Sequence, residues 1–442
     1  NDKWDTFWSL GGDWVISNES WLSGNDFLRF LKVKGSYGTT GDENGVGFFT
    51  GVNTFNPSLL GNEAAIRPRT FEDPNLTWER ASQWQVGAEF SLGSFLDGVI
   101  DYYQKDTENL IFERRVSPST GVAVIVTNDG ELRNSGLEFD MNFHLVNTQD
   151  VTLDLSVNGA VYDNEITVMP LDPETGEPAL FQNVGAYGYE QGRSIFDFYM
   201  REYAGVDPAD GYPMWYEYYD DINSNGVLDP GEELRNNEGV PDGSLTPYVN
   251  ANPDANIQRT VTKTYANSTE LYINKSSIPD LAGAFRLAGK FGNFNVNMQF
   301  TYSMGGYAYD SQYAELMHDN NGGILATNRH KDVRSRWRQP GDITSVPLIA
   351  DRVIPNINSQ SSRFITKTDF IALNNILVGY DLPRKVLGKS GIDMVNIYAS
   401  GDNLFISSAR EGFNPQTSQT GNSGRGLYAP LTTITVGARL KF

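Results

Sequence analysis

Cysteine is absent from the 442-residue sequence, and histidine occurs only three times, as His144, His318 and His330. The lack of cysteine excludes a disulfide framework and any zinc or redox chemistry that depends on thiols. The three histidines are scattered without the spacing of metal ligands, so no site is assigned to them. No nucleophile paired with a base, glycine-rich phosphate loop or spaced carboxylate pair stands out either, and we therefore expect no enzymatic activity.

Long apolar runs and an excess of basic residues are missing as well. No run of about 18 apolar residues occurs, which excludes a transmembrane helix. The 34 Lys and Arg residues against 55 Asp and Glu residues give a net charge of −21, which argues against nucleic acid as a partner. A membrane could still be crossed by a closed β-barrel, because strands of about ten alternating residues never form a long apolar run.

Alternation of apolar and polar residues, with the period of a β-strand, is abundant. The apolar positions of the last ten residues are Ile434, Val436, Ala438, Leu440 and Phe442. The same pattern occurs in segments 137–145, 151–161 and 294–304. The strands of a soluble β-sandwich alternate in the same way, so alternation alone does not identify the class of protein.

The lengths of the connections between strands favour one all-β architecture. We expect thirteen strands, near residues 5–16, 27–38, 82–92, 97–106, 132–146, 150–162, 195–205, 212–219, 283–292, 294–305, 369–381, 393–402 and 433–442. Short connections between them alternate with long ones, which are 39–81, 107–131, 163–194, 220–282, 306–368 and 403–432. This regularity predicts an antiparallel up-and-down transmembrane β-barrel with short periplasmic turns and long extracellular loops.

The odd number of expected strands carries a further expectation. A bacterial single-chain barrel has an even number of strands and both termini at the periplasm, whereas this chain would enter its first strand from the outside. We therefore expect residues 1–442 to be the C-terminal portion of a barrel, preceded by an odd number of further strands.

Seven motifs distributed over the chain resemble those of one family. They are DYYQKDTENLIF (101–112), NDGELRNSGLEFDM (128–141), GVDPADGYPMW (205–215), RWRQPGD (336–342), FIALNNILVGYDLP (370–383), YASGDNLF (398–405) and YAPLTTITVGARLKF (428–442). Each motif is weak alone, but in this order they make the chain similar to the C-terminal part of the SusC/RagA-type TonB-dependent transporters of the Bacteroidetes. That family has a plugged barrel of about 22 strands, so nine strands and the plug domain would precede the thirteen expected here.

The resemblance implies a function, a location and partners. It implies TonB-dependent import of a nutrient, a glycan or a peptide, across the outer membrane, beneath a SusD-like surface lipoprotein. Contact with TonB would be made by the missing N-terminal part. One alternative is a barrel that serves as a scaffold in an envelope assembly without active transport. Another is a soluble all-β domain that binds or cleaves glycans.

The last strand carries a second implication of the resemblance. Val436, Gly437, Leu440 and Phe442 correspond to the signal by which the outer-membrane assembly machinery recognises a final strand. The apolar residues of this strand would face lipid, where a charge at mid-depth costs about 2–4 kcal/mol.

One metal site is predicted from the residues themselves. The segment DINSNGVLDPGE (221–232) matches the calcium-loop pattern D-x-[DN]-x-[DN]-G-x5-E. The predicted ligands are the side chains of Asp221, Asn223, Asn225, Asp229 and Glu232 and the backbone carbonyl of Val227. The alternative is a turn rich in Asp and Asn that holds no metal. A calcium ion here would stiffen an extracellular loop.

Aromatic residues in the expected loops are candidates for contact with a ligand. They are Trp215, Tyr216, Tyr218, Tyr219, Tyr307 and Tyr309. Such rings could stack on a sugar or peptide, or a partner lid could bury them.

Overall fold

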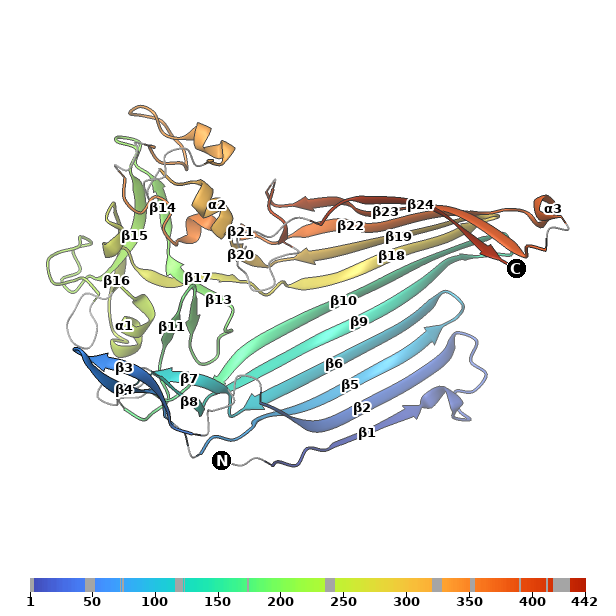
Figure 1. Ribbon diagram of the computed structural model, residues 1–442, viewed down its shortest axis with the longest axis horizontal. Coiled ribbons are helices and arrows are strands. Elements are labelled where there is room, and N and C mark those ends of the chain that lie inside the picture. Colours follow the sequence, from blue (N-terminus) through green and yellow to red (C-terminus); the bar gives the residue numbers. More distant parts are fainter. Residues whose placement is uncertain are drawn as a thin grey trace.

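The computed structural model describes residues 4–43, 52–71, 73, 75–115, 122, 124–172, 175–234, 243–319, 328–349, 354–388, 391–410, 412–415 and 430–442. Its main feature is an eleven-stranded antiparallel sheet whose strands follow one another in chain order (Figure 1). The strands are β1 (Ser9–Val15), β2 (Leu28–Asp42), β5 (Glu79–Leu92), β6 (Leu96–Glu108), β9 (Glu131–Asn147), β10 (Val151–Val168), β18 (Leu281–Phe291), β19 (Phe294–Met304), β22 (Phe370–Asp381), β23 (Met394–Ser408) and β24 (Thr433–Lys441).

The two ends of this sheet differ in their connections. At one end, to the right in Figure 1, the strands are joined by short segments such as 93–95, 148–150 and 292–293. At the other end all the long connections gather, and the longest comprises residues 169–280. We call these the turn end and the loop end. The alternation of short and long connections expected from the sequence is confirmed, and the C-terminus lies at the turn end.

Two of the thirteen strands expected in the barrel wall are not part of the large sheet, which forms that wall in the structure. Residues 195–205 and 212–219 form β13 (Asp197–Arg201), β14 (Tyr203–Val206) and β15 (Pro213–Asp220), which belong to smaller sheets in the long loop. These strands are shorter than the 9–11 residues or so that cross a bilayer. Three consecutive side chains of β13, those of Phe198, Tyr199 and Met200, are buried, so β13 lacks one wet and one apolar face. The large sheet therefore has eleven strands, still an odd number.

The other elements lie at the loop end, apart from two short helices at the turn end (Figure 1). The small sheets also contain β3 (Thr54–Leu60), β4 (Glu63–Thr70), β7 (Ile111–Arg115), β8 (Val124–Asn128), β11 (Gln182–Val184), β12 (Tyr187–Tyr189), β16 (Ile257–Thr262), β17 (Glu270–Ser276), β20 (Tyr307–Tyr309) and β21 (Ile365–Lys367). The α-helices are α1 (Leu245–Ala251), α2 (Ser311–Leu316) and α3 (Arg384–Leu387), and 3-10 turns cover Ile16–Asn18, Tyr265–Asn267, Lys331–Ser335 and Ser362–Phe364. Of the helices in the described part of the chain, none has the length and hydrophobicity needed to cross a bilayer.

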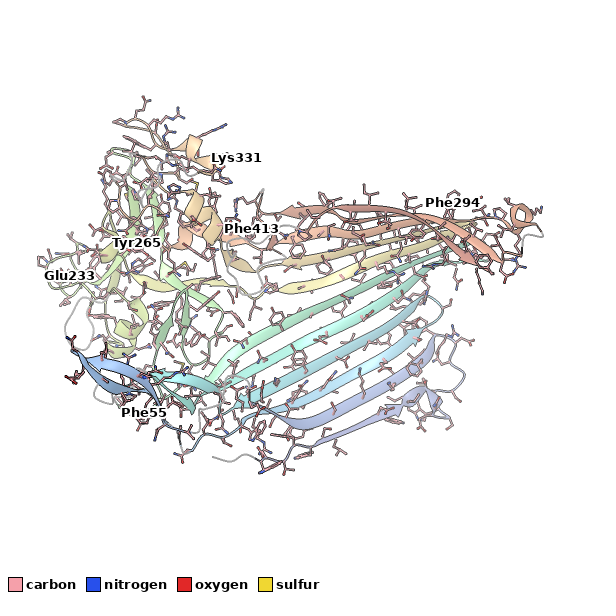
Figure 2. The ribbon with its side chains drawn as sticks, in the orientation of Figure 1. Phe55, Glu233, Tyr265, Phe294, Lys331 and Phe413 are labelled. Atoms are coloured by element: carbon pink, nitrogen blue, oxygen red, sulfur yellow. The ribbon has the colours of Figure 1, made fainter. Side chains whose placement is uncertain are left out.

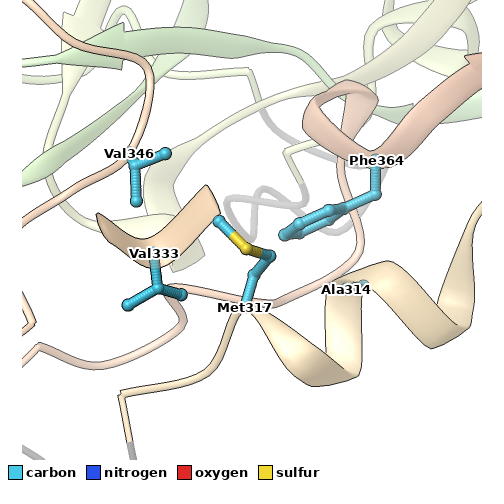
Figure 3. Packing of buried hydrophobic residues seen from close by; sticks show 5 residues of the cluster. All are labelled: Ala314, Met317, Val333, Val346 and Phe364. Atoms are coloured by element: carbon cyan, nitrogen blue, oxygen red, sulfur yellow. The ribbon is translucent and has the colours of Figure 1, made fainter. Parts of the chain in front are cut away.

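Buried apolar residues concentrate at the loop end and not in the large sheet. One cluster joins α2 to the segments that follow it, through Ala314, Met317, Val333, Val346 and Phe364 (Figure 3). The long loops therefore fold into a packed unit with a core of its own, which we call the head.

Candidate functional site

The large sheet has one apolar face and one polar face along its whole width. On β19 the apolar face carries Phe294, Met298 and Tyr302, and the register of the pairing places Phe285 of β18 beside Phe300, with stacked rings 4.6 Å apart. Apolar side chains on this face are exposed, for example Leu145 (54%) and Val436 (75%). Because nothing in the described part of the chain covers these residues, this face must meet a solvent other than water.

The height of the apolar face matches the interior of an outer membrane. Phe294 at the turn end of β19 (Figure 2) and Met304 at its loop end are ten residues apart. At about 3.4 Å per residue and a tilt of about 40°, they span about 25 Å, which is the height of the apolar band of outer-membrane barrels. Aromatic pairs border the band: Trp84 and Tyr102 toward the loop end, with ring centroids 5.3 Å apart, and Phe27 and Phe95 at the turn end, 6.4 Å apart.

The polar face carries paired charges and amides that suit a wet interior. Glu89 of β5 lies 2.7 Å from Lys32 and 3.5 Å from Lys34 of β2, and Lys34 also lies 3.0 Å from Asp101 of β6. Further along the sheet, Asn375 Nδ2 donates a hydrogen bond to Asp402 Oδ1 at 2.6 Å. A face with this pattern is unfavourable against lipid and favourable against water or polar protein.

The final strand lies where the sequence predicts, with its two faces as expected. β24 pairs with β23 in unbroken register from Asp402 opposite Thr433 to Met394 opposite Lys441. Val436 and Leu440 are exposed on the apolar face, and Phe442 follows the strand with 80% of its surface exposed. Gly437 lies on the polar face, under the ring of Tyr398. Their role as an insertion signal stays a prediction.

The predicted calcium loop folds as a tight turn directly after β15. Asp221 is 3% exposed, and its carboxylate accepts hydrogen bonds from the backbone amides of Asn225 at 3.0 Å and Gly226 at 2.9 Å. Gly226 has a φ of +73°, which favours glycine at this position. The amide groups of Asn223 and Asn225 both approach Asp229 Oδ2, at 2.9 and 2.8 Å.

Glu232 closes the loop from its other end. It is 5% exposed, and its Oε2 accepts a hydrogen bond from the Asp229 amide at 2.9 Å. Tyr219 lies beneath the loop, where burial, followed by the charges of Asp221, Glu232 and Asp229, raises the pKa of its hydroxyl. The predicted ligands Asp221, Asn223, Asn225, Asp229 and Glu232 are thus linked by hydrogen bonds within the loop, and their role as calcium ligands stays a prediction.

The donor set of this loop depends on amides as well as carboxylates. Within the described residues, no three His, Cys, Asp or Glu side chains form a group that could hold a metal. A cation in this loop would therefore need the side-chain oxygens of Asn223 and Asn225 and the carbonyl of Val227, as the motif predicts.

Several of the loop aromatics belong to the core of the head. Trp215 and Tyr219 are each 2% exposed, and Trp215 packs edge-to-face against Tyr265 with ring centroids 5.3 Å apart. Arg259 covers the ring of Tyr216, at 4.4 Å from its centroid. The expectation that Trp215 and Tyr219 contact a ligand or a partner is wrong, because their own chain buries them.

Two of the sequence motifs, which begin 131 residues apart in the chain, form one contact. Trp337 of the motif 336–342 is 7% exposed and lies over Gly211 of the motif 205–215. Its Nε1 donates a hydrogen bond to the Pro208 carbonyl oxygen at 3.0 Å, and the Gly341 amide donates to the same oxygen at 2.8 Å. Sequence reasoning missed this contact, since nothing in the spacing of the motifs shows that they meet.

Comparison with known proteins shows which proteins this chain resembles. Residues 1–193 match the family model described as TonB dependent receptor-like, beta-barrel. TonB-dependent receptor P3 of Formosa agariphila is 26% identical over 460 residues, and SusC of Bacteroides thetaiotaomicron, also a TonB-dependent receptor, is 24% identical over 464 residues. Residues 1–193 thus match a TonB-dependent receptor β-barrel, and the chain over its whole length is similar to SusC and related TonB-dependent receptors. Both alignments include all of this chain but only 42% and 40% of the relatives.

A solved structure shows the same fold. The RagAB peptide transporter superposes with a TM-score of 0.75 at 22% identity, over 98% of this chain and 43% of that one. The receptor barrel lies in the outer membrane, with its apolar face toward lipid, its turn end at the periplasm and its loop end outside. The alternative of a soluble all-β domain is therefore wrong.

Proposed function

We propose that this chain forms part of the barrel wall and the extracellular head of a transporter. The transporter imports a glycan or a peptide in a TonB-dependent manner. The observation that carries the proposal is the two-faced eleven-stranded sheet, which TonB-dependent receptors match over its whole length. A wide wall with a polar interior face suits passage of a hydrophilic solute. The RagAB structure belongs to a peptide transporter, which supports peptide as one of the two substrate classes.

The proposal includes partners outside this chain. In a barrel of about 22 strands, eleven further strands would join β1 to β24, which are the two edges of the described sheet. A plug would fill the interior, and TonB would contact the N-terminal part of the protein. A SusD-like surface lipoprotein would close over the head, whose position at the loop end suits a lid.

The test is uptake by cells that carry the full-length protein. Fluorescent peptides and fluorescent oligosaccharides are supplied in parallel to cells with and without the gene, and each uptake is repeated after deletion of TonB. We expect uptake of one class that requires both the gene and TonB. A scaffold role predicts no gene-dependent uptake of either class and, instead, loss of an envelope assembly when the gene is deleted.

We further propose that the loop 221–232 binds calcium. Asp221 and Glu232 are buried carboxylates, and with Asp229 they form no ion pair with Lys, Arg or His among the described residues. Buried negative charges without a counterion are unfavourable, and a divalent cation would relieve the cost. The ion would be held by Asp221, Asn223, Asn225, Val227, Asp229 and Glu232, and it would fix the connection between β15 and β16.

A further inference from the structure

The apolar face of the sheet carries a hollow near the loop end. An open groove of about 870 Å³ crosses the neighbouring strands β10, β18, β19, β22 and β23. Its lining includes Leu155, Val157, Leu281, Phe285, Tyr302 and Ile371. All six belong to the apolar face according to the strand register, so the groove opens toward lipid and not toward the interior of the barrel.

The walls of the groove are held by specific contacts. The Tyr302 hydroxyl reaches across β18 and donates a hydrogen bond to the Asn158 carbonyl oxygen on β10 at 2.9 Å. This bond fixes the Tyr302 ring, whose hydroxyl would otherwise lack a partner in the apolar layer. Phe285 is fixed by its stack on Phe300. The groove is therefore a preformed shape and not a gap that flexible side chains can fill.

The groove lies in the outer half of the apolar band. Leu281 and Met304 are opposite each other where β18 begins and β19 ends, at the loop end. The mouth there is polar, since Asp369, Ser407 and Ser408 line it. The short strands β20 and β21 lie beside this end of the sheet (Figure 1).

A lysine stands at the mouth. Lys367, the last residue of β21, is 58% exposed, and its Nζ lies 3.9 Å from Asp369 Oδ2. That distance is too long for a hydrogen bond. Asp369 instead accepts a hydrogen bond from the Gly305 amide at 2.7 Å. The Lys367 ammonium therefore has donors available for an anion at the depth of the lipid headgroups.

We propose that the groove binds one lipid of the outer leaflet, with an acyl chain against Phe285 and Tyr302 and its phosphate at Lys367. The groove is continuous with the lipid-facing surface and polar only at its mouth, which is the pattern of a lipid and not of a soluble solute. An unfilled hollow in the acyl layer would lose dispersion contacts, which a chain seated in it restores. A phosphate beside an ammonium group adds a charge-assisted hydrogen bond.

The test measures lipid retained by the full-length protein. The protein is purified in detergent and transferred to nanodiscs of phosphatidylethanolamine with lipid A, and native mass spectrometry counts the lipids that remain bound. Leu281→Trp fills the groove, and Leu145→Trp is the matched control on the same face outside it. Each methylene group of the acyl chain that loses its buried contact lowers the affinity for lipid about fourfold. Displacement of two methylene groups should therefore lower the retained lipid about fifteenfold in Leu281→Trp and leave it unchanged in Leu145→Trp.

A second pair of variants tests the headgroup. One basic residue near the surface is worth about fivefold in affinity for an anionic lipid, so Lys367→Glu, which changes the charge by two, lowers retention about thirtyfold. Lys367→Arg preserves retention, and Lys385→Glu in α3, at the turn end, leaves it unchanged. Equal loss of bound lipid in Leu281→Trp and Leu145→Trp would contradict the proposal that the groove binds the lipid. Unchanged retention in Lys367→Glu, or competition by inorganic phosphate alone, overturns the assignment of a lipid headgroup to Lys367.

Discussion

The contact between Trp337 and Gly211 gives a prediction whose size follows from the structure. A β-carbon on Gly211 would lie 2.5 Å from the indole ring, and the φ of Gly211 is +78°. Gly211→Ala therefore carries two costs: about 1–2 kcal/mol for a side chain in the left-handed region, and displacement of the ring. Trp337→Ala removes a buried ring and should cost about 3–5 kcal/mol of local stability.

A double-mutant cycle separates the two costs. In the Trp337→Ala background the clash is absent, so Gly211→Ala should cost only the backbone term of about 1–2 kcal/mol. The two substitutions should then be coupled by about 2–3 kcal/mol. Trp337→Phe should cost only about 1 kcal/mol beyond the change in ring size, because the Pro208 carbonyl keeps its hydrogen bond from the Gly341 amide.

Amide hydrogen exchange in the full-length protein measures these effects. The amides of Gly341 and Leu348, which donate to Pro208 and Gly211, report opening of the contact, while amides of the large sheet serve as an internal reference. Trp21→Ala, which removes an exposed ring at the turn end, is the control and should change neither set. If Gly211→Ala has the same effect with and without Trp337, the clash derived from the structure is wrong.

Three further predictions concern the loop, the wall and the last strand. Addition of calcium should slow amide exchange in residues 221–232, and Asp221→Asn or Glu232→Gln should abolish this effect. The control Asp254→Asn, in the neighbouring exposed segment, should preserve it. No response to calcium in the unmodified protein would contradict the calcium site. Met298→Lys on the apolar face should cost about 2–4 kcal/mol in refolding into lipid vesicles, and Gln299→Lys on the polar face less than half of that; equal costs would contradict the assigned faces. Phe442→Ala should lower the amount of assembled protein in the outer membrane more than Phe405→Ala, another exposed apolar-face ring, and equal amounts would exclude a terminal signal.

The head shows why two wall strands were wrongly predicted. Residues 195–205 and 212–219 have the composition of strands and do form strands, so the local prediction is confirmed. Whether a strand joins the wall depends on its pairing partner. β10 pairs with β18, and residues 169–280 separate these two strands in the chain. Such a long-range pairing leaves no local pattern. A signal was nevertheless present, because Phe198, Tyr199 and Met200 are three consecutive apolar residues where a wall strand would alternate.

The sequence by itself determined the two faces of the large sheet and the positions of its short turns, and it showed the calcium-loop motif of residues 221–232. These depend on neighbours within about ten residues, since a period of two fixes which side chains share a face and a twelve-residue motif places its own oxygens. Only the tertiary structure decided that the described large sheet has eleven strands, that Trp337 covers Gly211, and that five neighbouring strands form an open groove with Lys367 near its mouth. Each of these joins residues distant in the chain, and sequence periodicity carries no information about which distant segments pack together.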